Sequence, residues 1–186
     1  MYPFIATLIF KIWGWKVIGQ ENITTPKSIM AVVPHATWLD LVVGLCAKPE
    51  IPYKIYFLGK AELFHGPFGW FFREMGGLPV ERTKSTNLVD AVKKIFDQHE
   101  TLHIGIAPEG TRKNVSELKS GFYYMAVKAN VPLILVDFDY PNKKVVINKP
   151  FMPSGNFEED KVKIAAHFYK TKGIQKDWIA KYLADK

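Results

Sequence analysis

The sequence predicts an α/β domain with a central, mostly parallel sheet flanked by helices. Short apolar segments typical of buried strands alternate along the chain with segments of helical periodicity. The chain has 186 residues, of which 48% are hydrophobic, and this is enough to build the core of one domain. Because no linker, repeat or low-complexity tract interrupts the sequence, we expect one domain over residues 1–186.

Apolar segments bounded by turn residues are expected to form the strands. The first segment ends at Pro34, and the third follows the pair Gly76-Gly77. The expected strands are Ser28–Val33, Tyr53–Leu58, Leu78–Val80, Leu102–Ala107, Leu133–Phe138 and Lys144–Ile147. In parallel sheets of this class, functional residues gather in the loops at the carboxyl ends of the strands.

Helical periodicity marks the segments between these strands. The clearest helix is Thr86–Glu100, where Leu88, Val92, Ile95 and Phe96 form one apolar stripe. Further helices are expected at Leu39–Ala47, at Glu117–Asn130 and, as two helices broken near Gly173, over residues 157–185. Asn130 is expected to cap the end of its helix, since asparagine tolerates the left-handed conformation found there.

The first 16 residues form a short amphipathic segment. Its apolar run from Tyr2 to Phe10 falls far short of the ~20 residues that a spanning helix needs. Lys11 and Lys16 follow this run, whereas a signal peptide carries its positive charge first. Two interpretations stay open: a helix lying in a membrane interface, supported by Trp13 and Trp15, or a helix packed on the core.

The charge balance favours an anionic partner. Lysine and arginine total 25 against 18 acidic residues, which gives a net charge of +7. Such an excess suits nucleic acid, an acidic membrane surface or a phosphorylated substrate, although a merely basic soluble protein is the simpler alternative. No nucleic-acid-binding signature is present, and the 14% aromatic content favours lipid over nucleic acid.

Cysteine usage excludes several kinds of site. Cys46 is the single cysteine, so an internal disulfide and a zinc site built on two or four cysteines are impossible. A reducing compartment is the natural interpretation. Cys46 lies in an apolar helical segment, where core packing is favoured over a nucleophilic role beside His35.

The loop after the first expected strand holds a histidine and an aspartate. His35 is followed by four residues and then Asp40. The two side chains can meet if His35 lies in the loop and Asp40 points back from the first turn of the next helix. An aspartate in that place orients the imidazole of a general base. From spacing alone, a loop histidine beside a first-turn acid remains the alternative.

Cationic and polar residues follow the other expected strands. Lys60 and Arg82 come after the second and third strands, and both suit a phosphate group. The fourth strand is followed by a polar turn of Glu109, Gly110, Thr111 and Arg112. Motifs of other chemistries are absent, since the sequence has no GxSxG elbow, no phosphate-binding P-loop, no GxGxxG and no HExxH.

Together these segments resemble the glycerolipid acyltransferase family, which includes the 1-acylglycerol-3-phosphate acyltransferases. His35–Asp40 matches the HxxxxD motif, and Gly59–Arg82 is similar to the lysine-containing block that ends in proline and arginine. Pro108–Arg112 matches the Pro-Glu-Gly-Thr-Arg run, and Val131–Ile134 matches the Val-Pro block. All four occur in the order of the family, over about residues 28–138.

This resemblance implies an O-acyltransferase. His35 would take the proton of an acceptor hydroxyl, Asp40 would orient His35, and the hydroxyl would attack the thioester of acyl-CoA or acyl-carrier protein. No covalent enzyme intermediate, metal or other cofactor is implied. The acceptor would be a lysophospholipid such as 1-acylglycerol-3-phosphate, held by Lys60, Arg82, Glu109, Gly110, Thr111 and Arg112. Members of the family usually act at the cytoplasmic face of a membrane, so we expect a cytoplasmic protein, peripheral on the inner face of an anionic membrane.

Three alternatives stay open. The acceptor could be a different lysolipid. The protein could be a thioesterase-like hydrolase in which His35 activates water. It could also be a catalytically silent protein of the membrane surface, against which the intact His35 and Asp40 argue.

Overall fold

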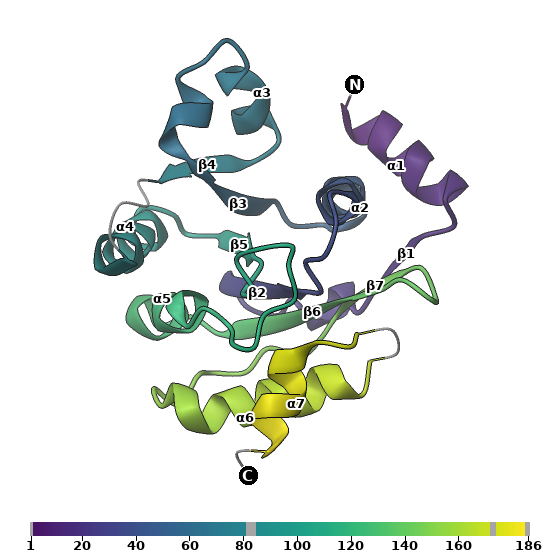
Figure 1. Ribbon diagram of the computed structural model, residues 1–186. Coiled ribbons are helices and arrows are strands. Elements are labelled where there is room, and N and C mark those ends of the chain that lie inside the picture. Colours follow the sequence, from purple (N-terminus) through teal and green to yellow (C-terminus); the bar gives the residue numbers. More distant parts are fainter. Residues whose placement is uncertain (1, 81–84, 172–173, 185–186) are drawn as a thin grey trace.

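The computed structural model of the protein describes residues 2–80, 85–171 and 174–184. These residues form a seven-stranded sheet with helices on both faces (Figure 1). The strands are β1 (Lys16–Ile18), β2 (Lys27–Val33), β3 (Ile55–Lys60), β4 (Gly77–Val80), β5 (Leu102–Ile106), β6 (Leu133–Asp139) and β7 (Lys144–Ile147). The α/β class expected from the sequence is confirmed.

The order of strands across the sheet is β1-β7-β6-β2-β5-β3-β4. Every neighbouring pair is parallel except β6 and β7, which are antiparallel. The carboxyl ends of β2 to β6 therefore meet at one edge of the sheet, and the turn from β6 to β7 lies at the same edge. Residues that follow these strands are brought together there.

The helices cover the two faces of the sheet unequally. They are α1 (Tyr2–Ile12), α2 (Leu39–Ala47), α3 (Gly69–Glu74), α4 (Ser85–Asp97), α5 (Gly121–Ala129), α6 (Phe157–Tyr169) and α7 (Asp177–Ala184). Short 3₁₀ segments occur at Gln20–Asn22, Lys48–Glu50 and Ala61–Phe64. α1 and α2 lie on one face, α4 to α7 lie on the other, and α3 lies beside the edge strand β4 (Figure 1).

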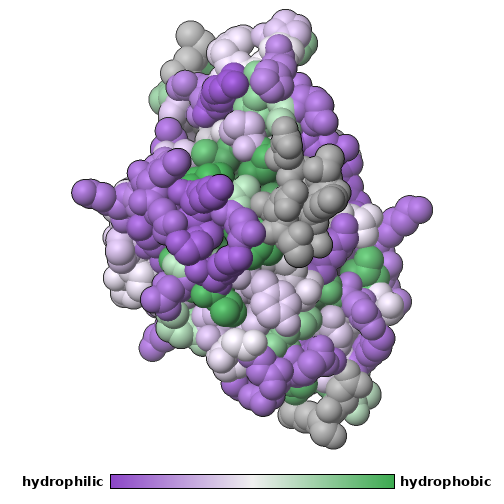
Figure 2. Space-filling model, turned by 90° about the vertical axis from the view of Figure 1, so that its left-hand side faces the viewer, coloured by the Kyte–Doolittle hydropathy of each residue, from purple (hydrophilic) through white to green (hydrophobic). Residues whose placement is uncertain are grey.

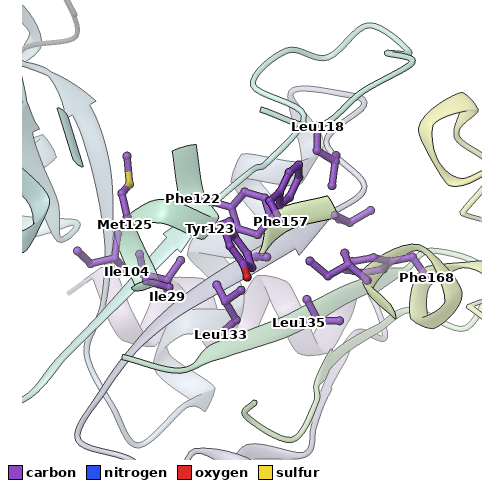
Figure 3. Close-up of a cluster of buried hydrophobic side chains, with 14 of the residues drawn as sticks. Ile29, Ile104, Leu118, Phe122, Tyr123, Met125, Leu133, Leu135, Phe157 and Phe168 are labelled. Carbon is purple, nitrogen blue, oxygen red and sulfur yellow. The ribbon is translucent and has the colours of Figure 1, made fainter. Parts of the chain in front are cut away.

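Each face of the sheet has its own hydrophobic cluster. The larger joins β2, β5 and β6 to α4 to α7, and Figure 3 shows Phe122, Tyr123 and Phe157 packed together in it. The smaller places Phe10 of α1 and Val43 of α2 against the opposite face. Consecutive strand residues supply opposite clusters, as the period of two requires.

One strand and one α-helix were not predicted, and another helix begins later than expected. β1 and α3 are only three and six residues long, and neither shows a periodicity that sequence analysis detects. α5 begins at Gly121 rather than at Glu117. The reason is tertiary: the amide of Leu118 donates to the hydroxyl of Tyr182, and the amide of Lys119 donates to the carbonyl of Pro108.

Several expected features of the helices are confirmed. Asn130 ends α5 in the left-handed conformation, with φ of 53°. The tail forms two helices, α6 and α7, whereas Gly173, near which a break was expected, lies outside the described residues. Cys46 is buried in α2, and this burial raises the pKa of its thiol, in keeping with core packing.

The N-terminal helix α1 combines features of both interpretations left open by its sequence. Ala6 and Phe10 are buried against the sheet. Phe4 and Ile12 point away from it and are 76% and 73% exposed. Trp15, which the sequence suggested as an interfacial residue, is buried. Among the described residues no helix is long and apolar enough to cross a membrane.

Candidate active site

His35 and Asp40 lie together at the carboxyl end of β2. His35 is in the loop that leaves the sheet, and Asp40 is in the first turn of α2. The Nδ1 atom of His35 is 3.5 Å from Oδ2 of Asp40. The carboxylate therefore points back from the helix toward the loop, in the arrangement that the five-residue spacing requires.

The Asp40 carboxylate is held by the loop that it supports. Its Oδ2 accepts hydrogen bonds from the backbone amides of Ala36 at 2.5 Å and Thr37 at 2.7 Å. Burial by itself raises the pKa of this carboxyl. The hydrogen bonds from His35 and Tyr140, followed by those from the two amides, outweigh burial and lower the pKa from 3.8 to about 2. Asp40 is therefore ionised at neutral pH and able to stabilise a protonated imidazole.

Tyr140 is a neighbour of this pair that the sequence analysis missed. It follows β6, and its hydroxyl donates a hydrogen bond to Oδ1 of Asp40. Burial and the neighbouring carboxylate raise the pKa of the Tyr140 phenol well above its usual value, so the phenol remains a donor. Tyr140 and Asp40 are 100 residues apart in the sequence, so no motif or spacing could have predicted their contact.

Glu109 occupies a buried position behind His35. Its Oε2 accepts the backbone amide of His35 at 2.9 Å and the Nζ of Lys176 at 3.3 Å. Its Oε1 accepts the indole N–H of Trp178 at 3.4 Å. In this structure the carboxylate anchors the histidine loop to the segment around α7. Lys176 and Trp178 lie in the C-terminal segment, where the sequence analysis expected helices and identified no candidate site residue, so these contacts were not predicted.

His35 and Asp40 line a cavity of about 780 Å³. α2 contributes Leu41, Gly44 and Ala47, and the sheet contributes apolar residues such as Val32 and Phe138. The lining continues to residues of α4 and α5, namely Leu88, Phe122 and Met125. On the side of the molecule that carries α4 and α5, hydrophobic atoms lie within a hollow bordered by hydrophilic ones (Figure 2). A cavity of this size and character is typical of small-molecule sites.

Two further expected site residues, Gly110 and Thr111, come from the turn after β5 at the same edge. Gly110 lines the cavity with φ of +63°, and the side chain of Lys119 passes so close that a Cβ at this glycine would meet it. Thr111 accepts the amide of Lys113 at 3.3 Å through its hydroxyl.

Lys60 and Arg112 are exposed and do not belong to the described residues that line the cavity. Arg82 lies outside the described residues. Lys119, in contrast, is a cation that does line the cavity, and it comes after the polar run at residues 109–112, shortly before α5 begins.

Comparison with known proteins shows to which family the chain is similar. A family model described as Acyltransferase matches residues 14–137. The 1-acyl-sn-glycerol-3-phosphate acyltransferase of Bacillus subtilis (strain 168) is 28% identical over 152 residues, covering 76% of this chain and 73% of that protein. The 1-acyl-sn-glycerol-3-phosphate acyltransferase beta of Homo sapiens is 30% identical over 147 residues.

The match to the human protein covers 76% of this chain and 52% of that protein, so the chain spans about half the length of this relative. Lysophosphatidylcholine acyltransferase 2 of Danio rerio is 27% identical over 147 residues, covering 75% of this chain and 27% of that protein. The family model matches more than half of the chain, including the segment with His35 and Asp40. The chain therefore belongs to the glycerolipid acyltransferase family and is an acyltransferase.

Proposed function

We propose that this enzyme transfers a fatty acyl group from acyl-CoA or acyl-carrier protein to the hydroxyl of a lysophospholipid, and that the acceptor is 1-acylglycerol-3-phosphate. The observation that carries the proposal is the His35–Asp40 pair in the wall of a large apolar cavity. The relatives from Bacillus subtilis and Homo sapiens, both named for 1-acyl-sn-glycerol-3-phosphate, support the choice of acceptor.

The geometry of the pair assigns the two nitrogens of His35 different tasks. Nδ1 faces Asp40, so it carries the proton, and Nε2 holds the lone pair. Nε2 takes the proton of the acceptor hydroxyl while the hydroxyl oxygen attacks the thioester carbon. When the tetrahedral intermediate collapses, the C–S bond breaks and the departing thiolate takes that proton back from His35. The ester and the free thiol are the products.

A cationic rim would hold the phosphate of the acceptor. Lys119 lines the cavity beside Gly110, and Lys60 and Arg112 are exposed near the same edge of the sheet. These side chains supply the positive charge that a phosphate requires, and the sequence motif adds Arg82, which lies outside the described residues. The apolar lining suits an acyl chain, whose burial is favoured at roughly 0.8 kcal/mol per CH₂.

We also propose that the protein acts as a peripheral protein on the cytoplasmic, inner face of an anionic membrane. Phe4, Leu8 and Ile12 are exposed on α1 and repeat every four residues, so they share one side of the helix. Phe68 and Trp70, around the start of α3, are each 68% exposed. Exposed apolar residues on a protein of net charge +7 favour an anionic lipid surface.

A vesicle assay tests the membrane proposal. The protein should sediment with vesicles of phosphatidylcholine and phosphatidylglycerol, and the double variant Phe4→Ser/Ile12→Ser should remain in the supernatant. Tyr169→Ser, which changes an exposed aromatic residue of α6, is the matched control and should sediment normally. Wild-type protein that stays in the supernatant at low salt would contradict the proposal.

The transfer assay mixes purified protein with labelled palmitoyl-CoA or palmitoyl-carrier protein and a panel of lysolipids. An acylated product from 1-acylglycerol-3-phosphate that His35→Ala does not form supports the proposal. If only another lysolipid gives an acylated product, that lysolipid replaces 1-acylglycerol-3-phosphate as the proposed acceptor. Free fatty acid without acylated lipid would favour the hydrolase, and neither product would favour a silent protein of the membrane surface.

A further inference from the structure

We propose that Tyr140 is a positioning residue for the His35–Asp40 pair, and that it acts by holding one oxygen of the Asp40 carboxylate so that the other faces His35. This inference rests on the proposed acyl transfer at His35. It concerns a residue that none of the four sequence motifs contains and that follows β6, the strand next to β2 in the sheet, in the turn between β6 and β7.

The two oxygens of Asp40 have separate sets of partners. Oδ2 faces Nδ1 of His35 and accepts the two backbone amides of the loop. Oδ1 accepts the hydroxyl of Tyr140 and, at the longer distance of 3.4 Å, the hydroxyl of Thr37. Rotation of the carboxylate would break the hydrogen bonds of both oxygens at once. The Tyr140 hydroxyl therefore contributes to the orientation in which Oδ2 meets the imidazole.

Tyr140 is itself held firmly. Its backbone amide donates to Phe138, and its carbonyl accepts the amide of Lys143 at 3.2 Å. The edge of an indole meets its ring, since the centroids of Trp15 and Tyr140 are 5.2 Å apart with an interplanar angle of 89°. Trp15 directly precedes β1, whose first amide, on Lys16, donates to the carbonyl of Lys143 at 3.0 Å. The N-terminal segment thus supports the phenol that contacts the catalytic pair.

The hydrogen bond from the Tyr140 hydroxyl also weakens the negative charge that the Asp40 carboxylate presents to His35. Without it, Asp40 would stabilise a protonated His35 more strongly, and the base would be available only at higher pH. A merely structural tyrosine would not produce this effect. Among the described residues, the polar groups that contact the Asp40 carboxylate are the side chains of His35, Thr37 and Tyr140 and the backbone amides of Ala36 and Thr37, so removal of one hydroxyl changes a defined set of contacts.

Tyr140→Phe tests the proposal because it removes the hydroxyl and keeps the ring against Trp15. We expect kcat to fall about 10- to 100-fold, the effect of losing a hydrogen bond to a charged group. KM for both substrates should stay unchanged, and the acid limb of the kcat/KM profile should move to higher pH. Wild-type activity, or an acid limb that does not move to higher pH, would overturn the proposal.

The matched control is Tyr123→Phe. The hydroxyl of Tyr123 donates to Oδ2 of Asp160 at 2.7 Å, so this variant loses another buried tyrosine–aspartate hydrogen bond, one away from the cavity. It should lower the melting temperature and leave kcat and the pH profile unchanged. An equal loss of kcat in both variants would assign the effect to stability and overturn the positioning role.

A second variant, Trp15→Phe, keeps the test usable if Tyr140→Phe fails to fold. It leaves the Tyr140 hydroxyl in place and weakens the support of its ring, so a smaller loss of kcat with the same direction of pH shift is expected. A raised KM with an unchanged kcat would count against the proposal. Failure of the proposed function is distinct from all these results, because wild-type protein would then form no acylated lipid.

Discussion

Within the part of the chain that the structure describes, two histidine–aspartate pairs look alike in isolation. In the first, His35 and Asp40 are 3.5 Å apart, with side chains 26% and 3% exposed. In the second, Nε2 of His167 lies 3.0 Å from Oδ1 of Asp137, with side chains 30% and 5% exposed. The second pair is the closer one. Distance and burial therefore do not identify which pair carries the chemistry.

The surroundings of the two pairs do differ. His35 and Asp40 line the cavity, and His35 lies in a loop whose amides bind the carboxylate. Asp137 joins β6 to α6 through His167, and it also accepts the side-chain amide of Asn148 at 3.1 Å. Neither His167 nor Asp137 is among the described residues that line the cavity. Access to the cavity, rather than the distance between the two partners, separates the candidate active site from the structural contact.

Among the variants that distinguish the two pairs, His35→Ala should have the largest effect on activity. Loss of the general base should lower kcat/KM by about 10²- to 10⁴-fold, while the circular dichroism spectrum and melting temperature remain close to those of the wild type. Steady-state kinetics with the acceptor found in the transfer assay measure this effect. If the variant keeps the activity of the wild type, His35 is not the general base.

Asp40→Asn should have the next largest effect, of about 10²-fold or more on kcat, because the amide no longer stabilises the imidazolium. It should also change acid stability. The folded pKa of Asp40 lies below its ordinary value, so its contribution is present above about pH 4 and is lost as the pH falls through about 2. This contribution is on the order of 2 kcal/mol.

Denaturant unfolding of wild type and Asp40→Asn at several pH values checks that part of the prediction. The difference in free energy of unfolding between the two proteins should shrink as the pH falls from about 5 to about 2. A difference that does not depend on pH would show that Asp40 has an ordinary pKa in the folded protein.

Glu109→Gln should act mainly on stability. The side chain of Lys176 is 8% exposed and would lose its charged partner, and breaking such a buried pair costs about 3–5 kcal/mol. A smaller fall in kcat should accompany it, since the amide carbonyl can still accept the N–H of His35. Thermal unfolding and kinetics of the same preparation separate the two effects, and a fall in activity as large as that of His35→Ala would place Glu109 in the chemistry.

His167→Ala should have the smallest effect on activity and completes the comparison. Removing a hydrogen bond to the Asp137 carboxylate should lower the free energy of unfolding by about 1.5–3 kcal/mol. Turnover at a temperature well below the transition should match the wild type. A loss of kcat comparable with that of His35→Ala would show that the His167–Asp137 pair is needed for turnover and is not only structural.

The sequence alone predicted the features that depend on neighbouring residues. Alternating apolar strands and periodic helices determined the α/β class, and the left-handed end of α5 at Asn130 followed from the properties of asparagine. The approach of His35 and Asp40 also depends on local geometry, because a loop and one helical turn separate them. Five residues are few enough for the spacing to allow the contact, and the resemblance of this segment to the HxxxxD motif favoured it.

Only the tertiary structure decided the contacts between residues far apart in the chain. It brings Tyr140 to Asp40 across 100 residues and Trp178 to Glu109 across 69 residues. It also sets β7 antiparallel to β6 and delays the start of α5. The physical reason is that hydrophobic periodicity specifies which face of an element is buried but not which partner covers it. The sequence thus predicted the proposed catalytic pair, whereas the folded chain selected the groups that orient it.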